Sequence, residues 1–424
     1  MSRRFLSCLL GFALAAAALS PLAGCASRAL AAHDLMEGVQ PSEQATTSDE
    51  NKGTEKAVSE DQANALADFA VTLFQSSRAD GATLVSPLSV DYALGMTANG
   101  ARGETLSQME QVLGMPIDEL NESLHAYAEA LPDDDDCKLS VANSLWIKEG
   151  LDAEQHFLQT NATWYGAGMF EAPFDESTVA DINQWTSQNT DGMIDSILDK
   201  MSPDAVMYLI NAVAFDAKWE TPYEDSQVLE GTFTAQGEIE QPAVFMNSDE
   251  HLYLESANAI GFVKPYSNPS YEFAALLPNE GTSVDDLIES LDGTGLRTML
   301  GAAQQVTVDA KLPKFEVKSE ANMAETLAAM GMADAFDREK ADFRGISTEE
   351  NLFINRVLHR AYINVDEKGT KAAAATSVEI STTSAMVEPE AVKTVHLDRP
   401  FVYLLIDRAT NLPLFMGVIE GLEG

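Results

Sequence analysis

Residues 366–390 read DEKGTKAAAATSVEISTTSAMVEPE and lie between strand-like apolar runs at 361–365 and 401–406. Read with a period of two, one face carries only small or apolar side chains, namely Thr370, Ala372, Ala374, Thr376, Val378 and Ile380. The opposite face carries the charges of Lys371 and Glu379. This alternation is typical of a half-buried strand, whereas the Ser and Thr residues of the far end are typical of an exposed loop. The stretch predicts a loop that can become a strand; the simpler alternatives are a flexible linker and a helix begun by the alanine run.

The rest of the chain mixes helix and strand signals in an order typical of an α+β fold. Ser59 and Gln62 fit a capping box that opens a helix, and apolar residues at helical spacing follow. An almost unbroken apolar run at 205–215 predicts a central strand that is buried on both faces. The runs at 401–406 and 414–419 flank a short polar turn and predict a hairpin. Helices come first and strands dominate the C-terminus, which favours α+β over a doubly wound sheet.

The N-terminus has the pattern of a bacterial export signal. Arg3 and Arg4 precede an apolar stretch at 5–19, which is too short for a spanning helix. The motif LAGC at 22–25 resembles a lipobox, in which the thiol of Cys25 takes a lipid; an ordinary secretory signal with a chance cysteine is the alternative. The predicted organisation is a lipoprotein-type signal peptide at 1–24, a lipidated cysteine and flexible acidic tether at 25–57, and one folded domain at 58–424.

Cysteine usage and the export signal together predict the location of the protein. Cys8 leaves with the signal and Cys25 is lipidated, so Cys137 has no partner for an intrachain disulfide. The folded domain must then be stabilised by its own core, which a domain of this length can supply. We expect a lipoprotein anchored at the outer face of a membrane, or an extracellular protein if it is shed.

Net charge excludes several classes of partner. The 424 residues include 67 acidic and 26 basic side chains, for a formal net charge of −41, while the 45% hydrophobic content is that of a globular protein. This charge excludes a nucleic-acid partner and disfavours docking on an anionic membrane. Membrane attachment is therefore expected only through the N-terminal lipid, and the protein partners that acidic charge attracts are basic.

Motifs for enzymatic chemistry are missing from the sequence. It contains no GxSxG, HExxH, P-loop or GxGxxG pattern, and its six histidines have no metal-ligand spacing. The four aspartates at 133–136 are interpreted as a solvated loop rather than a cation site, because adjacent carboxylates do not by themselves form a coordination shell. The sequence predicts a protein that is not an enzyme and needs no metal or cofactor.

A series of motifs in a fixed order over residues 60–422 resembles the serpin family. They are SPLSV at 86–90, GARGET at 100–105, NSLW at 143–146, INQW at 182–185, NAVAF at 211–215, LPKF at 312–315, RPF at 399–401 and LFMG at 414–417. The resemblance implies a single α+β domain with three β-sheets, eight to nine helices and an exposed reactive loop at about 366–397. It also implies a monomer that inhibits serine proteases.

The resemblance implies a suicide-substrate mechanism and assigns the hinge of the loop. A protease forms an acyl-enzyme with the loop, and the cut loop then enters the large sheet as a new strand and traps the protease. The hinge residues are Glu367, Gly369, Thr370, Ala372, Ala373, Ala374, Ala375 and Thr376. The inward positions are small and uncharged, so they can enter a packed core without overfilling it. This favours an inhibitory hinge over a non-inhibitory one.

The position of the cut bond follows from the same resemblance. In inhibitory relatives this bond comes fourteen residues after the hinge glycine, which places it at Thr383–Ser384 when counted from Gly369. Thr suits the shallow pocket of an elastase-like protease, and the lack of Lys or Arg between Lys371 and Lys393 argues against a trypsin-like target. Met386 is the alternative position, because the segment after Ser384 is longer than in well-known relatives.

Other positions match the places where the large sheet opens. Ser86, Ser89, Asn211 and His359 match a polar cluster whose hydrogen bonds would hold the sheet closed. Trp219 is predicted with this sheet-opening group. Trp219 and Glu367 also match the region that first receives the hinge.

The sequence leaves three functions open. The first is a suicide inhibitor that forms a covalent complex with an elastase-like serine protease. The acidic charge of the chain suggests that this protease is a basic host protein. The second is a cross-class inhibitor of cysteine proteases or a non-inhibitory surface serpin. The third is a lipoprotein that only binds a ligand and uses 366–390 as a linker.

Overall fold

The computed structural model describes residues 30–41, 58–78, 84–132, 137–202, 204–348, 351–370 and 392–422. Several expectations therefore lie outside the described residues. They are the signal peptide, the lipidated Cys25, most of the tether, the four aspartates at 133–136, the hinge beyond Thr370, and the cut-bond candidates Thr383, Ser384 and Met386.

The described part of the chain holds nine α-helices, which agrees with the eight to nine expected. They are α1 (Glu60–Ser77), α2 (Pro87–Ala98), α3 (Gly103–Leu113), α4 (Ile117–Ala130), α5 (Gln155–Trp164), α6 (Glu176–Asn189), α7 (Val284–Glu289), α8 (Gly293–Gly301) and α9 (Ala324–Leu327). The predicted capping box opens α1, because the Ser59 hydroxyl accepts from the Gln62 N–H and the Gln62 side chain accepts from the Ser59 N–H. None of the helices in the described segments is long and apolar enough to span a membrane.

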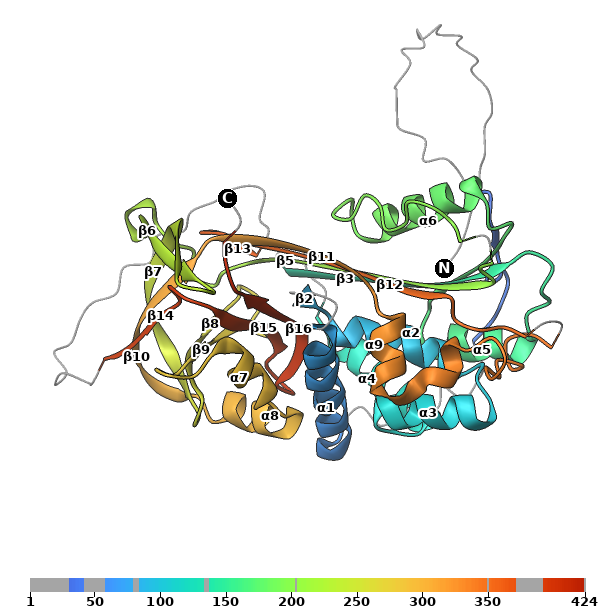
Figure 1. The fold of residues 1–424 in the computed structure, drawn as a ribbon, viewed down its shortest axis with the longest axis horizontal. Helices are drawn as coiled ribbons and strands as arrows, with labels where there is room; N and C mark the ends of the chain where they lie inside the picture. The colour runs from blue at the N-terminus through green and yellow to red at the C-terminus, as the bar shows by residue number, and fades with distance from the viewer. Residues whose placement is uncertain are drawn as a thin grey trace, which may run out of the picture.

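A seven-stranded sheet crosses the molecule. Its strands, in spatial order, are β1 (His33–Asp34), β4 (Gly168–Ala172), β3 (Cys137–Lys148), β5 (Met207–Lys218), β13 (Gly369–Thr370), β12 (Arg356–Val365) and β11 (Phe315–Asn322). Helix α6 covers one face of this sheet, and the other helices and the second sheet lie against the opposite face (Figure 1). The large sheet is thus a layer between two cores.

The other nine strands of the described residues form one hydrogen-bonded set that branches at β7, and the expected α+β fold with three sheets is confirmed. Its hydrogen-bonded path is β14 (Lys393–His396), β10 (Gln304–Pro313), β7 (Ile239–Glu255), β8 (Ala259–Pro265), β9 (Tyr271–Pro278), β15 (Phe401–Asp407), β16 (Leu412–Ile419) and β2 (Leu84–Val85), with β6 (Val228–Ala235) beside β7. The predicted C-terminal hairpin is the β15–β16 pair.

The apolar run at 205–215 is explained by burial on both faces of β5. Met207, Leu209 and Val213 belong to the main core, whereas Tyr208 and Ile210 belong to the smaller core under α6. Successive side chains of a strand point to opposite faces. A strand between two cores must therefore be apolar at consecutive positions, as the sequence analysis expected.

Residues 30–41 differ from the flexible tether expected at 25–57. Strand β1 pairs antiparallel with β4, and the Ala31 and Ala32 N–H groups each donate to Asp181 Oδ2 at 2.8 Å. Apolar side chains of this segment pack on both cores, among them Leu30, Leu35 and Met36. The sequence gives little signal for this docking, because a two-residue strand has no measurable periodicity.

Candidate functional site

The centre of the large sheet is closed over most of its length and occupied by an extra strand at one end. Strands β5 and β12 pair in parallel from Tyr208 opposite Arg356 to Ala214 opposite Tyr362. Beyond this ladder, β13 lies between them, antiparallel to both, with Thr370 opposite Ala217 of β5 and Val365 of β12. The hinge residues Gly369 and Thr370 already occupy the position of a new central strand.

A tight reversal connects β12 to β13. The Asp366 N–H donates to the Gly369 carbonyl at 2.9 Å, and the Asp366 carboxylate accepts from the Lys368 and Gly369 N–H groups at 2.8 and 3.2 Å. A Cβ at Gly369 would lie 2.1 Å from the Ala217 carbonyl oxygen. Glycine is therefore required for the backbone of the hinge to approach β5 this closely.

Two aromatic residues that directly follow β5 and β8 receive the hinge. Thr370 is fully buried, and its hydroxyl lies 2.6 Å from the hydroxyl of Tyr266. The Tyr266 ring stacks on Trp219, with centroids 4.6 Å apart and an interplanar angle of 9°. The indole N–H of Trp219 donates to the Asp366 carbonyl, and the backbone N–H of Trp219 donates to the Lys368 carbonyl, both at 2.9 Å. Thr370 thus faces inward, as the alternation of the sequence predicts.

Glu367 is held from two directions. Its carboxylate pairs with Lys314, and its carbonyl accepts from the Tyr223 N–H at 2.8 Å. The hydrogen bond from Lys314 lowers the pKa of the Glu367 carboxyl, partly offset by burial. Both side chains keep about a third of their surface exposed, 32% each, so this ion pair is screened by solvent and contributes modestly.

A row of polar side chains crosses the sheet between its middle strands. Asn143 of β3 lies opposite Asn211 of β5, which lies opposite His359 of β12. The Asn211 amide donates to the Ser89 carbonyl and hydroxyl oxygens at 2.6 and 2.5 Å, and to Asn143 Oδ1 at 2.5 Å. Helix α2 is therefore fixed to the row through Ser89, and its N-cap Ser86 is fixed to β16, because Ser86 Oγ donates to the Leu414 carbonyl at 2.7 Å.

The protonation of His359 follows from its two partners. The Ser86 N–H donates to His359 Nε2 at 3.2 Å, so Nδ1 carries the proton and donates to Asn211 Oδ1. Complete burial lowers the pKa of His359 to about 3. The neutral ring links β12 to β5, and any strand entering between them must break this hydrogen bond.

The structure brings together most of the residues expected at the opening of the sheet. Ser86, Ser89, Asn211 and His359 form one buried cluster. Trp219 lies with the hinge rather than in this cluster, because the eight residues that separate it from Asn211 span about 26 Å of strand. Two participants were not assigned to the site from the sequence, Asn143 and Tyr266; the NSLW motif begins with the first, and no signal pointed to the second.

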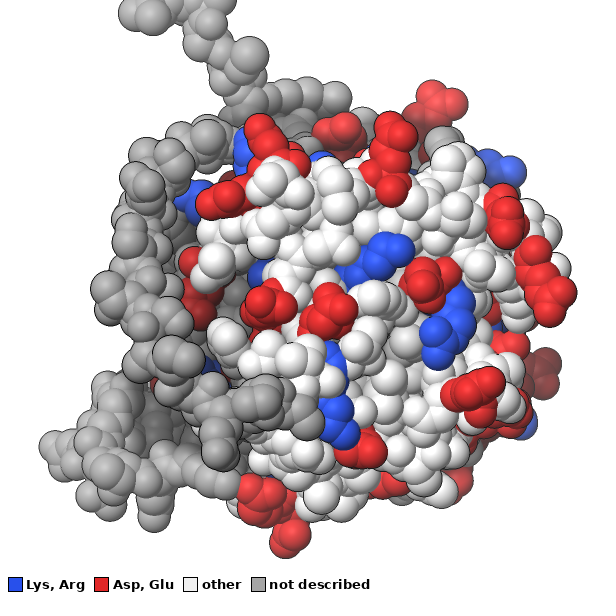
Figure 2. All heavy atoms as spheres, turned by 90° about the vertical axis from the view of Figure 1, so that its left-hand side faces the viewer, with Lys and Arg blue, Asp and Glu red and all other residues white. Residues whose placement is uncertain are grey.

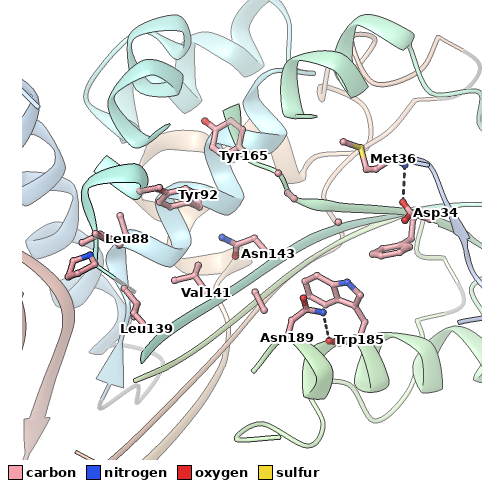
Figure 3. Close-up of a pocket in the computed structure, with 18 of the residues that line it drawn as sticks. Asp34, Met36, Leu88, Tyr92, Leu139, Val141, Asn143, Tyr165, Trp185 and Asn189 are labelled. Carbon is pink, nitrogen blue, oxygen red and sulfur yellow. Dashed lines mark hydrogen bonds between the residues drawn. The ribbon is translucent and has the colours of Figure 1, made fainter. Parts of the chain in front are cut away.

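A cavity of about 600 Å³ lies beside the cluster, at the outer side of β3. Asn143 lines it together with Val141 of the same strand and Leu88, Tyr92 and Tyr165 on the helical side (Figure 3). Strand β4 pairs only with Ser144–Lys148 of β3, so it does not cover this part of the edge. Side chains here border open space, so β3 can shift with less repacking than a filled core would need.

Comparisons with known proteins agree with an architecture in which a closed sheet holds the start of an extra strand. The family profile described as "Serpin (serine protease inhibitor)" matches residues 64–421. An uncharacterized serpin-like protein of Thermococcus kodakarensis is 30% identical over 86% of this chain and 86% of its own length. Iripin-8 of Ixodes ricinus is 31% identical over 80% of this chain and 87% of its own. The chain belongs to the serpin family.

Solved structures show which state the fold resembles. The thermophilic serpin tengpin in its native state is 46% identical, with a TM-score of 0.84 over 92% of this chain and all of that one. Its latent state gives 0.76 over 87% of this chain. Human thyroxine-binding globulin, 25% identical, gives 0.77 over 86% of this chain and 99% of its own. The higher score with the native state agrees with the closed β5–β12 ladder.

The depressed pKa of His359 predicts a specific acid sensitivity. The unfolded chain binds a proton at His359 below about pH 6.5, whereas the native ring stays neutral down to about pH 3. Stability from this residue is complete above pH 6.5 and is lost as the pH falls toward 3, by about 1.4 kcal/mol per pH unit. Thermal unfolding is measured between pH 4 and 8. His359→Gln should lack the pH-dependent stability that comes from His359, so the difference in stability between wild type and the variant should become smaller as the pH falls.

The exposed His251 supplies the control for this experiment. His251→Gln should keep the pH dependence of wild type, including the part that comes from the carboxylates common to all three proteins. A deficit of His359→Gln that stays constant over the whole pH range would contradict a neutral, buried His359.

Proposed function

We propose that this serpin inhibits serine proteases as a suicide substrate whose cut loop inserts between β5 and β12. The observation that supports this most is β13, since Gly369 and Thr370 already pair with both strands at the place where insertion would begin. The family is one of serine protease inhibitors.

The chemical step uses the nucleophile of the protease. Its serine Oγ attacks the carbonyl carbon of the residue before the cut bond, and the bond to the next nitrogen breaks as that nitrogen takes a proton from the protease histidine. The new ester links the protease to the N-terminal part of the loop. Water would normally hydrolyse this ester, so the inhibitor must move the protease before that happens.

Insertion requires the seam between β5 and β12 to open. Neighbouring strands lie about 4.8 Å apart, so a strand between them doubles the separation of β5 and β12. The link from His359 to Asn211 breaks, and the new strand supplies hydrogen bonds to both neighbours in place of one ladder. A protein that gains a ladder in this way is more stable after cleavage than before it.

We propose Thr383–Ser384 as the cut bond and an elastase-like protease as the target, with Met386 as the alternative position. The support is the small side chain of Thr383 and the count from Gly369. A preference for a basic protease has weaker support. Acidic and basic side chains both occur on the described surface at the β6, β10 and β14 end of the molecule (Figure 2), where Lys393 pairs with Glu255.

A non-inhibitory role is the second candidate, since thyroxine-binding globulin shares the fold and was solved as a complex with thyroxine. A cross-class inhibitor of cysteine proteases would use the same insertion. The small, buried Thr370 and the closely packed Gly369 favour an inhibitor over a carrier, because a carrier needs no hinge that fits the sheet.

We further propose that the protein is exported and anchored through Cys25, or shed; the LAGC motif at 22–25 is the support.

Trapping should depend on the side chain at position 370. With an elastase-like protease, the wild-type protein should form a covalent complex that survives boiling in detergent. Thr370→Arg should still be cleaved, but it should form less than about a tenth of the wild-type yield of covalent complex, because the guanidinium would have to be buried beside Tyr266. Thr370→Val, which keeps the size, is the control and should retain the complex. A Thr370→Arg protein that traps as well as wild type would exclude the insertion mechanism.

Cleavage of the loop should raise thermal stability. The protein is treated with a protease that cuts within 371–391 but is not trapped, and unfolding is followed by circular dichroism. Insertion adds a ladder on each side of the new strand, which we expect to contribute several kcal/mol. Because each kcal/mol raises the unfolding temperature by about 2–4 °C, the total rise should be well over 10 °C. An unchanged temperature would indicate that 371–391 is only a linker.

The cut bond can be read from the C-terminal fragment. Mass spectrometry of the peptide released by an elastase-like protease should give a fragment that begins at Ser384. A fragment that begins at Val387 would instead establish Met386 as the residue before the cut, and a start elsewhere would contradict both counts.

A further inference from the structure

A buried ion pair lies beneath the hinge. Lys264 of β8 and Glu250 of β7 meet at 2.8 Å, and their side chains are only 4% and 7% exposed. Ser248 also donates to the same Glu250 oxygen, at 2.6 Å. The sequence analysis gave no role to either residue, and both lie outside the sheet-opening cluster.

The ammonium group of Lys264 is placed between two aromatic rings. Its Nζ lies 4.4 Å from the centre of the Tyr223 ring and 5.5 Å from that of Trp219. A desolvated cation in this position is attracted to the negative faces of both rings. Burial first, and then the Glu250 carboxylate, raise the pKa of the Tyr223 hydroxyl, so this ring stays uncharged.

The same two aromatic residues hold the backbone of the hinge. The Tyr223 N–H donates to the Glu367 carbonyl and the Trp219 N–H to the Lys368 carbonyl. Packing alone does not fix Tyr223, because a cavity of about 710 Å³ is lined by Tyr223, Glu250 and Lys264. Trp219 is also held by its stacking on Tyr266, so the cation is the contact that ties the Tyr223 ring to the Trp219 ring beside the hinge.

Stability alone does not explain this pair. Replacing a buried ion pair by apolar residues of similar volume is often neutral or stabilising, whereas removal of one partner is strongly destabilising. The specific property that an apolar pair would lose is the attraction of one point charge for two ring faces. This attraction determines where the two rings lie rather than the total free energy of folding.

We propose that Lys264, held by Glu250, is a positioning residue for loop insertion. It orients Trp219 and Tyr223 so that the hinge starts between β5 and β12, and this inference rests on the proposed inhibitory function. When the cation is missing, the hinge is released from the rings more often and enters the sheet more slowly. Hydrolysis of the acyl-enzyme then competes better, and more inhibitor is cleaved for each protease trapped.

The test uses the full chain with Lys264→Met and Glu250→Met combined, which removes both charges and leaves no lone ion. Lys311→Met is the matched control, since Lys311 lies 3.9 Å from the Phe245 ring but belongs to β10. Three quantities are measured: the unfolding temperature, the hydrogen exchange of peptides that contain Trp219 and Tyr223 in the native protein, and the ratio of cleaved inhibitor to covalent complex after reaction with an elastase-like protease.

We expect the double variant to unfold at nearly the same temperature as wild type, to exchange about tenfold faster at Trp219 and Tyr223, and to show a several-fold higher ratio of cleaved inhibitor to complex. The Lys311→Met control should match wild type in all three. Unchanged exchange, an unchanged ratio, or a large fall in unfolding temperature would each overturn the proposal. If wild type forms no complex with any protease, the proposed function fails, and exchange alone decides whether Lys264 positions the rings.

Discussion

The hydrogen bond from His359 to Asn211 is the constraint on which the function of this fold depends. It joins β12 to β5 at the centre of the seam through which a new strand would pass in the proposed mechanism. The same Asn211 amide holds Ser89 of α2, so the helix beneath the sheet is tied to the seam as well. Because all these groups are buried, each costs free energy if it is left without a partner, and the seam tends to be either closed or fully re-paired.

The hinge and the polar row control two different places on one seam. Thr370 lies opposite Ala217, whereas the polar row lies at position 211, about 20 Å further along β5. An incoming strand that starts at β13 therefore separates the ladder residue by residue before it reaches Asn211. This geometry divides the process into an early step, set by Trp219 and Tyr266, and a later step, set by His359. Side chains at the two places have no contact, so their effects on trapping should be separable.

Much of the fold was predictable from local patterns, and much of the site was not. The apolar run of β5 and the alternation through Thr370 are periodic, and periodicity reports which faces are buried. The contacts of Tyr266 with Thr370 and of Lys264 with Glu250 join strands through the tertiary fold, and no spacing in the sequence encodes them. Trp219 contacts the hinge, which is the region that it matches in sequence, and lies away from Asn211, with which it was also grouped. The docking of residues 30–41 was missed because β1 is too short to show a pattern.

The native state also depends on how the far end of the loop is held. Strand β14 pairs in parallel with β10 in the second set of strands, and the Leu397 N–H donates to the Lys311 carbonyl at 2.8 Å. The chain between Thr370 and Lys393 is therefore fixed at both ends, by β13 in one sheet and by β14 in another. To insert while uncut, it would have to remove β14 from β10 and lose those hydrogen bonds. A cut between the two anchors removes this cost at once, because the N-terminal part of the loop can then enter the sheet while β14 stays where it is. In the proposed mechanism, the free energy of insertion would thus be withheld by connectivity rather than by an unfavourable contact in the seam.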